Sequence, residues 1–233
     1  MTDLLTGLIT SIVPIVLAIT LHEAAHGFAA LALGDDTARR AGRLSINPLR
    51  HVDRVGTIIL PGLLLAAQLL TIHRVAFMFG WAKPVPVDAM RFRRPRQGMA
   101  LVAAAGPACN FVLAWLAALA LHGTDGMVGS AGDIVNTMLE MFILSNLVLG
   151  LFNLLPIPPL DGGRIVVGLL PAPLAFRWAQ LERAGLALVL LGVFLLPQAL
   201  RSFGVAFDPV GSALNTVIPQ AFDLVLRLAG HAV

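Results

Sequence analysis

The stretch Leu4–Leu33, LLTGLITSIVPIVLAITLHEAAHGFAALAL, is apolar over more than the roughly 20 residues that a helix needs to span a bilayer. Near its end it contains three ionisable groups in the pattern HExxH, namely His22, Glu23 and His26. Ionisable groups are costly in hydrocarbon and tend to mark function there. This stretch therefore predicts a membrane helix that carries a functional site.

The spacing of these three groups suits a metal ion. On a helix, positions i and i+4 project from one face, so His22 and His26 can bind one metal ion together. Glu23 lies about 100° around the helix from His22, where its carboxylate can reach a metal-bound water. A metal site that activates water inside a membrane helix favours hydrolysis of a bond that lies within the bilayer.

The composition of the whole chain is that of a polytopic membrane protein. Of its 233 residues, 58% are hydrophobic and only 12% are charged, whereas a soluble domain carries about 25% charged residues. We expect one membrane-embedded domain over residues 1–233, with a catalytic core at about 4–165 and C-terminal helices at about 184–233. The formal net charge of +3 gives no reason to expect a nucleic-acid partner. The single cysteine, Cys109, excludes a disulfide scaffold and CxxC zinc sites.

The distribution of apolar residues predicts an α-helical polytopic membrane protein with about five to six membrane segments. The tail at 202–233 is interrupted by Pro209 and Pro219, and it is either a sixth span or an amphipathic helix that lies on the membrane. The first five segments are Leu4–Leu33, Thr57–Phe79, Met99–Leu121, Ile134–Leu155 and Ala184–Leu200.

The basic residues predict the orientation of these segments. Eleven of the 16 Lys and Arg residues lie between Arg39 and Arg96, in the connections before and after the second segment. The positive-inside rule places both connections in the cytoplasm. A single crossing would put them on opposite sides, so we expect a re-entrant second segment with a turn at Pro61-Gly62. The loop at 123–133 has no Lys or Arg and is expected outside, as is the N-terminus.

Two histidines leave a zinc site incomplete, because catalytic zinc usually takes three protein ligands and a water. Asp161 is the strongest candidate, since the first and fourth segments end on the same predicted side. It follows a proline-rich run that breaks the helix, and we expect Gly162 and Gly163 to supply unusual backbone dihedrals that turn it toward the histidines. The full set of candidates for the third ligand is His51, Asp53, His73, Glu140 and Asp161.

HEAAH at 22–26, together with NLLPIPPLDGG at 153–163, resembles the site-2 protease family of intramembrane zinc metalloproteases, in its small bacterial form without a PDZ or CBS domain. Three further stretches are similar to motifs of that family. They are NPLRHVDRVG at 47–56, GWAKPVPV at 80–87 and AGPACN at 105–110.

The resemblance implies that His22, His26 and Asp161 bind one zinc ion per chain and that Glu23 is the general base. The substrate would be a transmembrane protein or peptide, cleaved within or near its membrane segment. The resemblance also implies that Asn110 and Asn153 lie near the site, where they hold the substrate backbone. Hydrogen bonding between helices is the alternative role of both asparagines.

The predicted setting is the cell membrane, a bacterial inner or plasma membrane, with the active site toward the cytoplasmic side and membrane lipids as partners. GWAKPVPV alternates apolar positions with two prolines, which predicts an exposed edge strand. That strand or the second segment would pair with an unwound substrate by strand addition. His51 and Asp53 either cap the second segment or line the site. The sequence specifies no oligomeric state.

The competing functions are a membrane metal transporter and a non-catalytic binder of membrane helices. A transporter would need polar ligands along a path through several helices. The polar residues within the predicted membrane segments instead concentrate near one depth, and Glu23 stands where hydrolysis needs a base.

Overall fold

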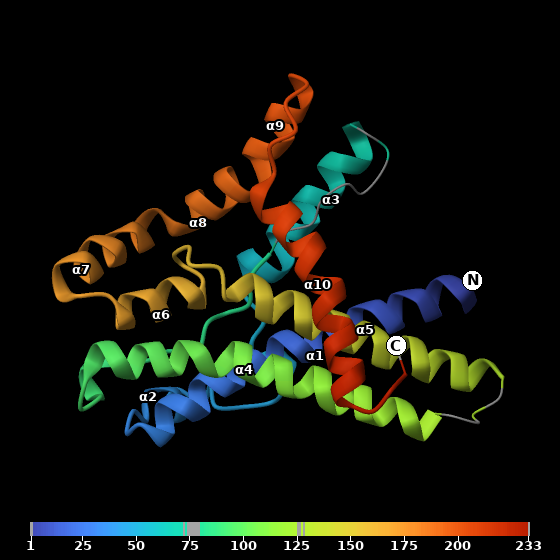
Figure 1. Ribbon diagram of the computed structural model, residues 1–233, viewed down its shortest axis with the longest axis horizontal. Helices are drawn as coiled ribbons and strands as arrows, with labels where there is room; N and C mark the ends of the chain where they lie inside the picture. The colour runs from blue at the N-terminus through green and yellow to red at the C-terminus, as the bar shows by residue number, and fades with distance from the viewer. Residues whose placement is uncertain (1, 72, 74–79, 125–126, 128, 233) are drawn as a thin grey trace.

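The computed structural model describes residues 2–71, 73, 80–124, 127 and 129–232, with side chains from residue 6 onward, and this part of the chain is helical without a strand. Figure 1 shows the arrangement of the helices. Their bounds are α1 Thr2–Ala32, α2 Thr37–Arg40, η1 Pro48–Arg50, η2 Arg54–Ile59, α3 Leu60–Thr71, η3 Ala89–Arg91, α4 Pro95–Leu121, η4 His122–Thr124, α5 Ser130–Asn153, α6 Asp161–Leu169, α7 Ala172–Gln180, η5 Leu181–Ala184, α8 Gly185–Leu188, η6 Val189–Leu195, α9 Leu196–Ser202 and α10 Pro209–Leu228.

The long helices α1, α4 and α5 lie side by side and form the centre of the molecule (Figure 1). Ala114, Ala117 and Ala118 of α4 are buried against Ile143 and Leu147 of α5. Small side chains let membrane helices approach closely, so that packing rather than the hydrophobic effect holds them together. This three-helix centre positions the residues of the HExxH motif and its partners.

Five helical stretches are long and apolar enough to cross a membrane, which confirms the prediction of a polytopic helical membrane protein. Three of them, Thr6–Ala32, Pro95–Thr124 and Ser130–Asn153, agree closely with the predicted first, third and fourth segments. The fifth, Ala172–Ser202, starts earlier than the predicted Ala184–Leu200, because α7, η5, α8, η6 and α9 continue one another.

The second stretch, Arg54–Thr71, shows that the predicted turn at Pro61-Gly62 is wrong. Pro61 lies inside this continuous helix, directly after the π-helical turn η2, and local π-turns are one way in which membrane helices accommodate a proline. The helix therefore continues through the proline. The end of the predicted second segment, at 74–79, lies outside the described residues.

The tail forms one helix, α10, so the predicted break at Pro219 is also wrong. The helix starts at Pro209, where Asp208 accepts a hydrogen bond from the N–H of Gly211 and caps the first turn. Val225, near its end, is buried against α4 and α5. Among the described helices of at least 18 residues, α10 is not one of the five apolar enough to span a membrane.

Two histidines fasten the C-terminal tail to the end of α4. The rings of His122 and His231 stack with their centroids 3.9 Å apart. The Nε2 of His122 donates to the carbonyl of Ala229 at 2.8 Å, and the Nε2 of His231 donates to the carbonyl of Ala118 at 2.7 Å. These bonds occupy carbonyls that a helix end would otherwise leave unpaired.

The connection between α3 and α4 is tied to the end of α1 through the buried carboxylate of Asp35. This carboxylate accepts hydrogen bonds from the N–H and hydroxyl of Thr37 and from the N–H of Asp88, the last at 2.7 Å. Arg91 lies 3.6 Å from Asp35 and 2.7 Å from Asp36. Burial raises the pKa of Asp35, but these hydrogen bonds and Arg91 outweigh it and hold the pKa below its usual value. These contacts around Asp35 fix the connection between α3 and α4, which borders the site.

Candidate metal centre

Three ligand atoms from α1 and α6 meet at one point. The Nε2 atoms of His22 and His26 lie 3.1 Å apart, as expected for positions i and i+4 on one helix face. The Oδ2 of Asp161 lies 3.1 Å from the Nε2 of His22 and 3.3 Å from that of His26. His22 and Asp161 are buried. Within the described residues this is the one group of three or more His, Cys, Asp or Glu side chains that could hold a metal ion.

Asp161 reaches the histidines because the chain turns sharply between α5 and α6. The expectation of unusual dihedrals at Gly162 and Gly163 is wrong, since both residues are helical in α6. These two positions instead need glycine because backbone atoms of the preceding turn approach them too closely to leave room for a side chain. A Cβ on Gly162 would lie 2.3 Å from the carbonyl oxygens of Leu154 and Leu155, and one on Gly163 would lie 2.7 Å from the nitrogen of Pro158.

The hydrogen bonds of the two histidines fix which ring nitrogen carries the proton. The Nδ1 of His26 lies 2.7 Å from the carbonyl of Val102, which can only accept, so this Nδ1 donates. The Nδ1 of His22 donates to the Oδ1 of Asn110 at 2.5 Å. In neutral rings both Nε2 atoms are therefore acceptors, and they face the Asp161 Oδ2, which has no hydrogen-bond donor.

Three acceptors that converge on one point repel one another unless a cation lies between them. The donor set of two imidazole nitrogens and one carboxylate oxygen is one that zinc takes in catalytic sites, where neighbouring ligands lie about 3.3 Å apart. The triangle of Nε2 and Oδ2 atoms has sides of 3.1 to 3.3 Å. The residues present fit a zinc ion.

A chain of buried amides supports His22 from behind. The Nδ2 of Asn110 donates to the Oδ1 of Asn146 at 2.7 Å, and the Nδ2 of Asn146 donates to the carbonyl of Phe142 at 2.8 Å. Asn110 and Asn146 are fully buried. This is the hydrogen bonding between helices that was the alternative for Asn110. Its predicted contact with substrate stays a prediction, and Asn110 does not line the site cavity.

We predict that Asn110→Leu lowers zinc affinity by about 10- to 100-fold, the usual effect of removing the partner that orients a histidine ligand. The leucine leaves the Nδ1–H of His22 and the Oδ1 of Asn146 without partners in a buried place. Competition with a zinc chelator in detergent measures the affinity. Asn146→Leu, which keeps the bond between His22 and Asn110, should have a smaller effect. Equal affinities for wild type and Asn110→Leu would contradict the orienting role.

Glu23 lines the same cavity, of about 520 Å³, as the three ligands. It is half-buried, and its Oε2 accepts a hydrogen bond from the N–H of Val85 at 3.1 Å. Val85 belongs to GWAKPVPV, whose predicted strand is not observed, because this segment hydrogen-bonds to η2, to the bend at His51 and to the side chain of Glu23 rather than to a strand. The N–H groups of Trp81 and Lys83 donate to the carbonyls of Gly56 and His51.

The other residues that the sequence singled out lie in different parts of the structure. Asn153 lines the site cavity, and its Nδ2 donates to the carbonyl of Leu149 at 3.0 Å. Asp53 caps η2 by accepting from the N–H groups of Val55 and Gly56, which is one of its two expected roles. His51 is buried beside the site, and its Nε2 donates to the carbonyl of Ser45. Asp53, His51, His73 and Glu140 do not join the three ligands.

Comparison with known proteins finds relatives of this chain. It is 38% identical over 191 residues to the "Putative zinc metalloprotease YwhC" of Bacillus subtilis (strain 168), an alignment that covers 80% of each chain. The chain belongs to peptidase family M50, the site-2 protease family. The family model, described as Peptidase family M50, matches residues 126–196, which include Asp161 and the proline-rich run before it.

A second relative is the "Putative zinc metalloprotease Rip2" of Mycolicibacterium smegmatis (strain ATCC 700084 / mc(2)155). It is 30% identical over 146 residues, which cover 63% of this chain and 51% of that protein. No solved structure matches the chain. The family, the relatives and the apolar helices together identify a zinc-type metalloprotease that spans the membrane several times.

Proposed function

We propose that this M50 protein is an intramembrane zinc endopeptidase that hydrolyses peptide bonds within or near the transmembrane segments of other proteins. His22, His26 and Asp161 hold one zinc ion per chain. The observation that carries the proposal is the convergence of three acceptor atoms, from the buried His22 and Asp161 and the half-buried His26, in one cavity with the carboxylate of Glu23. Both histidines and Glu23 lie in a helix long and apolar enough to cross a membrane.

Zinc bound by these ligands supplies a polarised water and a Lewis acid for the scissile carbonyl. Glu23 is the base that removes a proton from the attacking water and passes it to the leaving amine. The N–H of Val85 holds one oxygen of the Glu23 carboxylate, which leaves the other oxygen for the water. The side chain of Asn153 lies in the cavity, where its amide supports the substrate backbone or the developing oxyanion.

A helical substrate hides its carbonyls in internal hydrogen bonds, so it must unwind before it is cleaved. Residues 80–87 offer it a segment with which to pair. Trp81 and Lys83 use both their N–H and C=O groups inside the protein. Pro84 has no N–H, and the backbone of Ala82 makes no hydrogen bond with any described residue. Of the positions in this segment whose backbone makes no hydrogen bond with a described residue, Ala82 lines both neighbouring cavities, and we assign to it the two hydrogen bonds of an unwound substrate.

Glu23→Gln tests the proposal and separates it from transport. The amide keeps the size of the side chain but cannot take up a proton, so cleavage of a membrane substrate should fall to background while zinc content stays at the wild-type level. Zinc content and cleavage are measured on the same purified protein in lipid nanodiscs. Zinc transport that persists in Glu23→Gln would favour the transporter and contradict the protease.

The proposed location is the cell membrane, with the site facing the cytoplasm and the basic connections against lipid headgroups. Single cysteines at Arg50 and Arg93, introduced into a Cys109→Ala background, should both react with an impermeant thiol reagent from the cytoplasmic face only. That result supports the re-entrant placement of Arg54–Thr71. Labelling of the two cysteines from opposite faces would show that this helix, which is long enough to span, crosses the membrane.

A further inference from the structure

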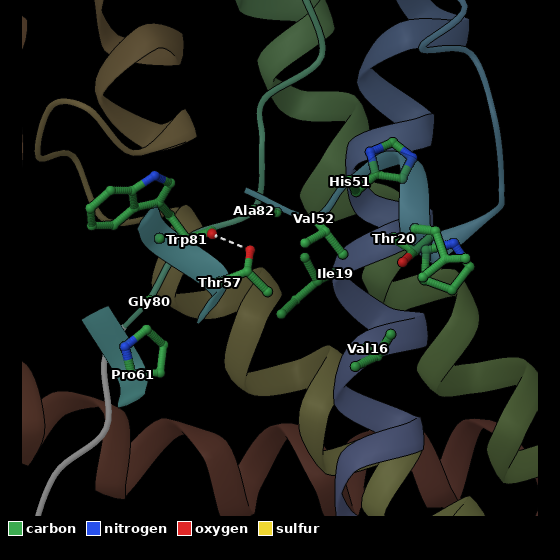
Figure 2. Close-up of a pocket in the computed structure, with 13 residues that line it drawn as sticks. Val16, Ile19, Thr20, His51, Val52, Thr57, Pro61, Gly80, Trp81 and Ala82 are labelled. Atoms are coloured by element: carbon green, nitrogen blue, oxygen red, sulfur yellow. Dashed lines mark hydrogen bonds between the residues drawn. The ribbon is translucent and has the colours of Figure 1, made fainter. Parts of the chain in front are cut away.

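A second cavity, of about 460 Å³, borders the proposed active site (Figure 2). Its walls come from α1, from residues 48–57, from Pro61 and from residues 80–82. Trp81 and Ala82 line both this cavity and the one that holds Glu23 and the three ligands. The two spaces therefore share a wall, and that wall is the segment proposed to pair with substrate.

The chemistry of the cavity selects an uncharged, apolar occupant. Apart from His51, none of its lining residues has an ionisable side chain. Figure 2 shows Ile19, Val52 and Thr57 directed toward the same space between α1 and residues 80–82. The hydroxyl of Thr57 donates to the carbonyl of Trp81 at 2.9 Å, so its donor is already used. Placing a charged side chain there would cost its hydration without a partner.

The wall of the cavity has little freedom to adapt. A Cβ on Gly56 would lie 2.4 Å from the indole of Trp81, so the ring rests directly on this glycine. The N–H of Trp81 donates to the carbonyl of Gly56 at 3.1 Å, and its carbonyl accepts from Thr57. A rigid wall discriminates between side chains by size, because a well-packed space tolerates neither a void nor an overlap.

The cavity lies within reach of the scissile bond. Thr20, Ile19 and Val16 lie two, three and six residues before His22, which on a helix corresponds to about 3 to 9 Å along the axis. An extended substrate advances about 3.3 Å per residue, with successive side chains on opposite faces. A side chain within three residues of the cleaved bond can therefore enter the cavity while the neighbouring backbone pairs with Ala82.

We propose that this cavity is the specificity pocket of the enzyme and that it receives one bulky apolar side chain of the unwound substrate, within three residues of the scissile bond. The proposal rests on the proposed function. The shared wall of Trp81 and Ala82 favours a substrate side chain over a lipid acyl chain, because the same two residues line the cavity of Glu23 and the three ligands, where the substrate backbone is cleaved.

Two variants that change the size of the pocket test this proposal. Val16→Trp fills it, and Ile19→Ala enlarges it. Ile15→Trp is the matched control, because Ile15 is the neighbouring residue on α1, is 47% exposed and does not line the pocket. Each protein is incubated with a peptide library prepared from a digested membrane proteome, and cleavage sites are mapped by mass spectrometry. Unchanged zinc content in all three variants shows that the metal centre is intact.

Wild type should prefer Leu, Phe or Met over Ala at one position near the cleaved bond. Val16→Trp should reverse this preference by roughly tenfold or more in kcat/KM at that position alone, as expected for a change of a few methylene groups in an apolar pocket. Ile19→Ala should favour the largest side chains, and Ile15→Trp should match wild type. The same preference in all four proteins, or an equal loss of rate at every position, would overturn the proposal.

A separate experiment distinguishes failure of the pocket proposal from failure of the proposed function. If no cleavage depends on Glu23, the proposed function fails, and the pocket is then examined by photocrosslinking. Ile19 is replaced by p-benzoylphenylalanine in Glu23→Gln protein and irradiated in native membranes. Adducts with an apolar peptide segment support a pocket for protein side chains, whereas adducts with lipid alone overturn it.

Discussion

Replacing Gly106 by alanine should abolish zinc binding and proteolysis, although this glycine donates no ligand. Gly106 lies on the face of α4 that meets the two imidazoles. A Cβ there would lie 2.5 Å from the Cε1 of His26 and 2.6 Å from both the Cε1 of His22 and the Nε2 of His26. These distances are shorter than any stable contact, so the rings or the helix must move.

The two rings cannot move without losing the arrangement of ligands. His22 is held by Asn110 and His26 by the carbonyl of Val102, and their Nε2 atoms are already 3.1 Å apart. Tilting either ring breaks its supporting hydrogen bond and shifts its Nε2 away from Asp161. Sites of this kind lose activity when ligands are displaced by an ångström or less.

Metal analysis of purified Gly106→Ala should find little zinc, and cleavage should be at background. Gly62→Ala is the control, because a Cβ on Gly62 has no heavy atom within 4 Å. Size-exclusion chromatography in detergent checks that both variants fold. A folded Gly106→Ala protein with a full equivalent of zinc would show that α4 can retreat from the histidines.

Residues whose roles follow from the spacing or hydropathy of their neighbours in the chain were predictable from the sequence. His22, Glu23 and His26 follow from helical spacing, and Asp161 follows from the predicted topology of the first and fourth segments. The structure brings the two histidines and Asp161 to one point, with Glu23 in the same cavity. Long apolar segments predicted α1, α4 and α5 to within a few residues. Such signals are strong because they depend on residues close together in the chain.

Residues whose role depends on packing between helices were not predictable. Asn146 is one polar residue in an apolar segment, and only the fold shows that it supports His22 through Asn110. Gly106 was noted only as part of the motif AGPACN, since its need for a missing Cβ arises from α1 rather than from its own helix. Gly162 was expected to adopt unusual dihedrals, but the carbonyls of Leu154 and Leu155 decide its identity instead.

The errors at Pro61 and Pro219 have a common cause. Proline usually ends or kinks a helix, because it lacks an N–H and its ring clashes with the preceding turn. Pro61 follows the π-helical turn η2 inside one continuous helix, and Pro219 lies inside α10, which continues through it. In membranes, local π-turns such as η2 accommodate prolines like Pro61 that would end a helix in water. Hydropathy therefore predicted the spans better than proline predicted the breaks.

We expect zinc to stabilise the folded protein chiefly by relieving the repulsion around Asp161. Without a cation, the Oδ2 of Asp161 and the Nε2 atoms of His22 and His26 are acceptors within 3.3 Å of one another, and the Oδ2 has no donor. Zinc removes this conflict, and a ligand that binds only the folded protein stabilises it by about 4 kcal/mol at a free concentration 1,000 times its Kd. Chelation should therefore lower the melting temperature of wild type markedly.

The Asp161→Asn variant should lose this zinc-dependent stabilisation of the folded protein, and it should also lose all proteolytic activity. The asparagine has the same shape, but its neutral oxygen is a much weaker zinc ligand than a carboxylate, and its amide can donate to a histidine Nε2 instead. The melting temperature of the variant should be the same with zinc and with chelator, and metal analysis should find less than one zinc per chain. Asp133→Asn, which changes an exposed carboxylate in the first turn of α5, should respond to zinc as wild type does. A zinc-dependent rise in melting temperature that survives in Asp161→Asn would mean that the two histidines bind the metal with another third ligand.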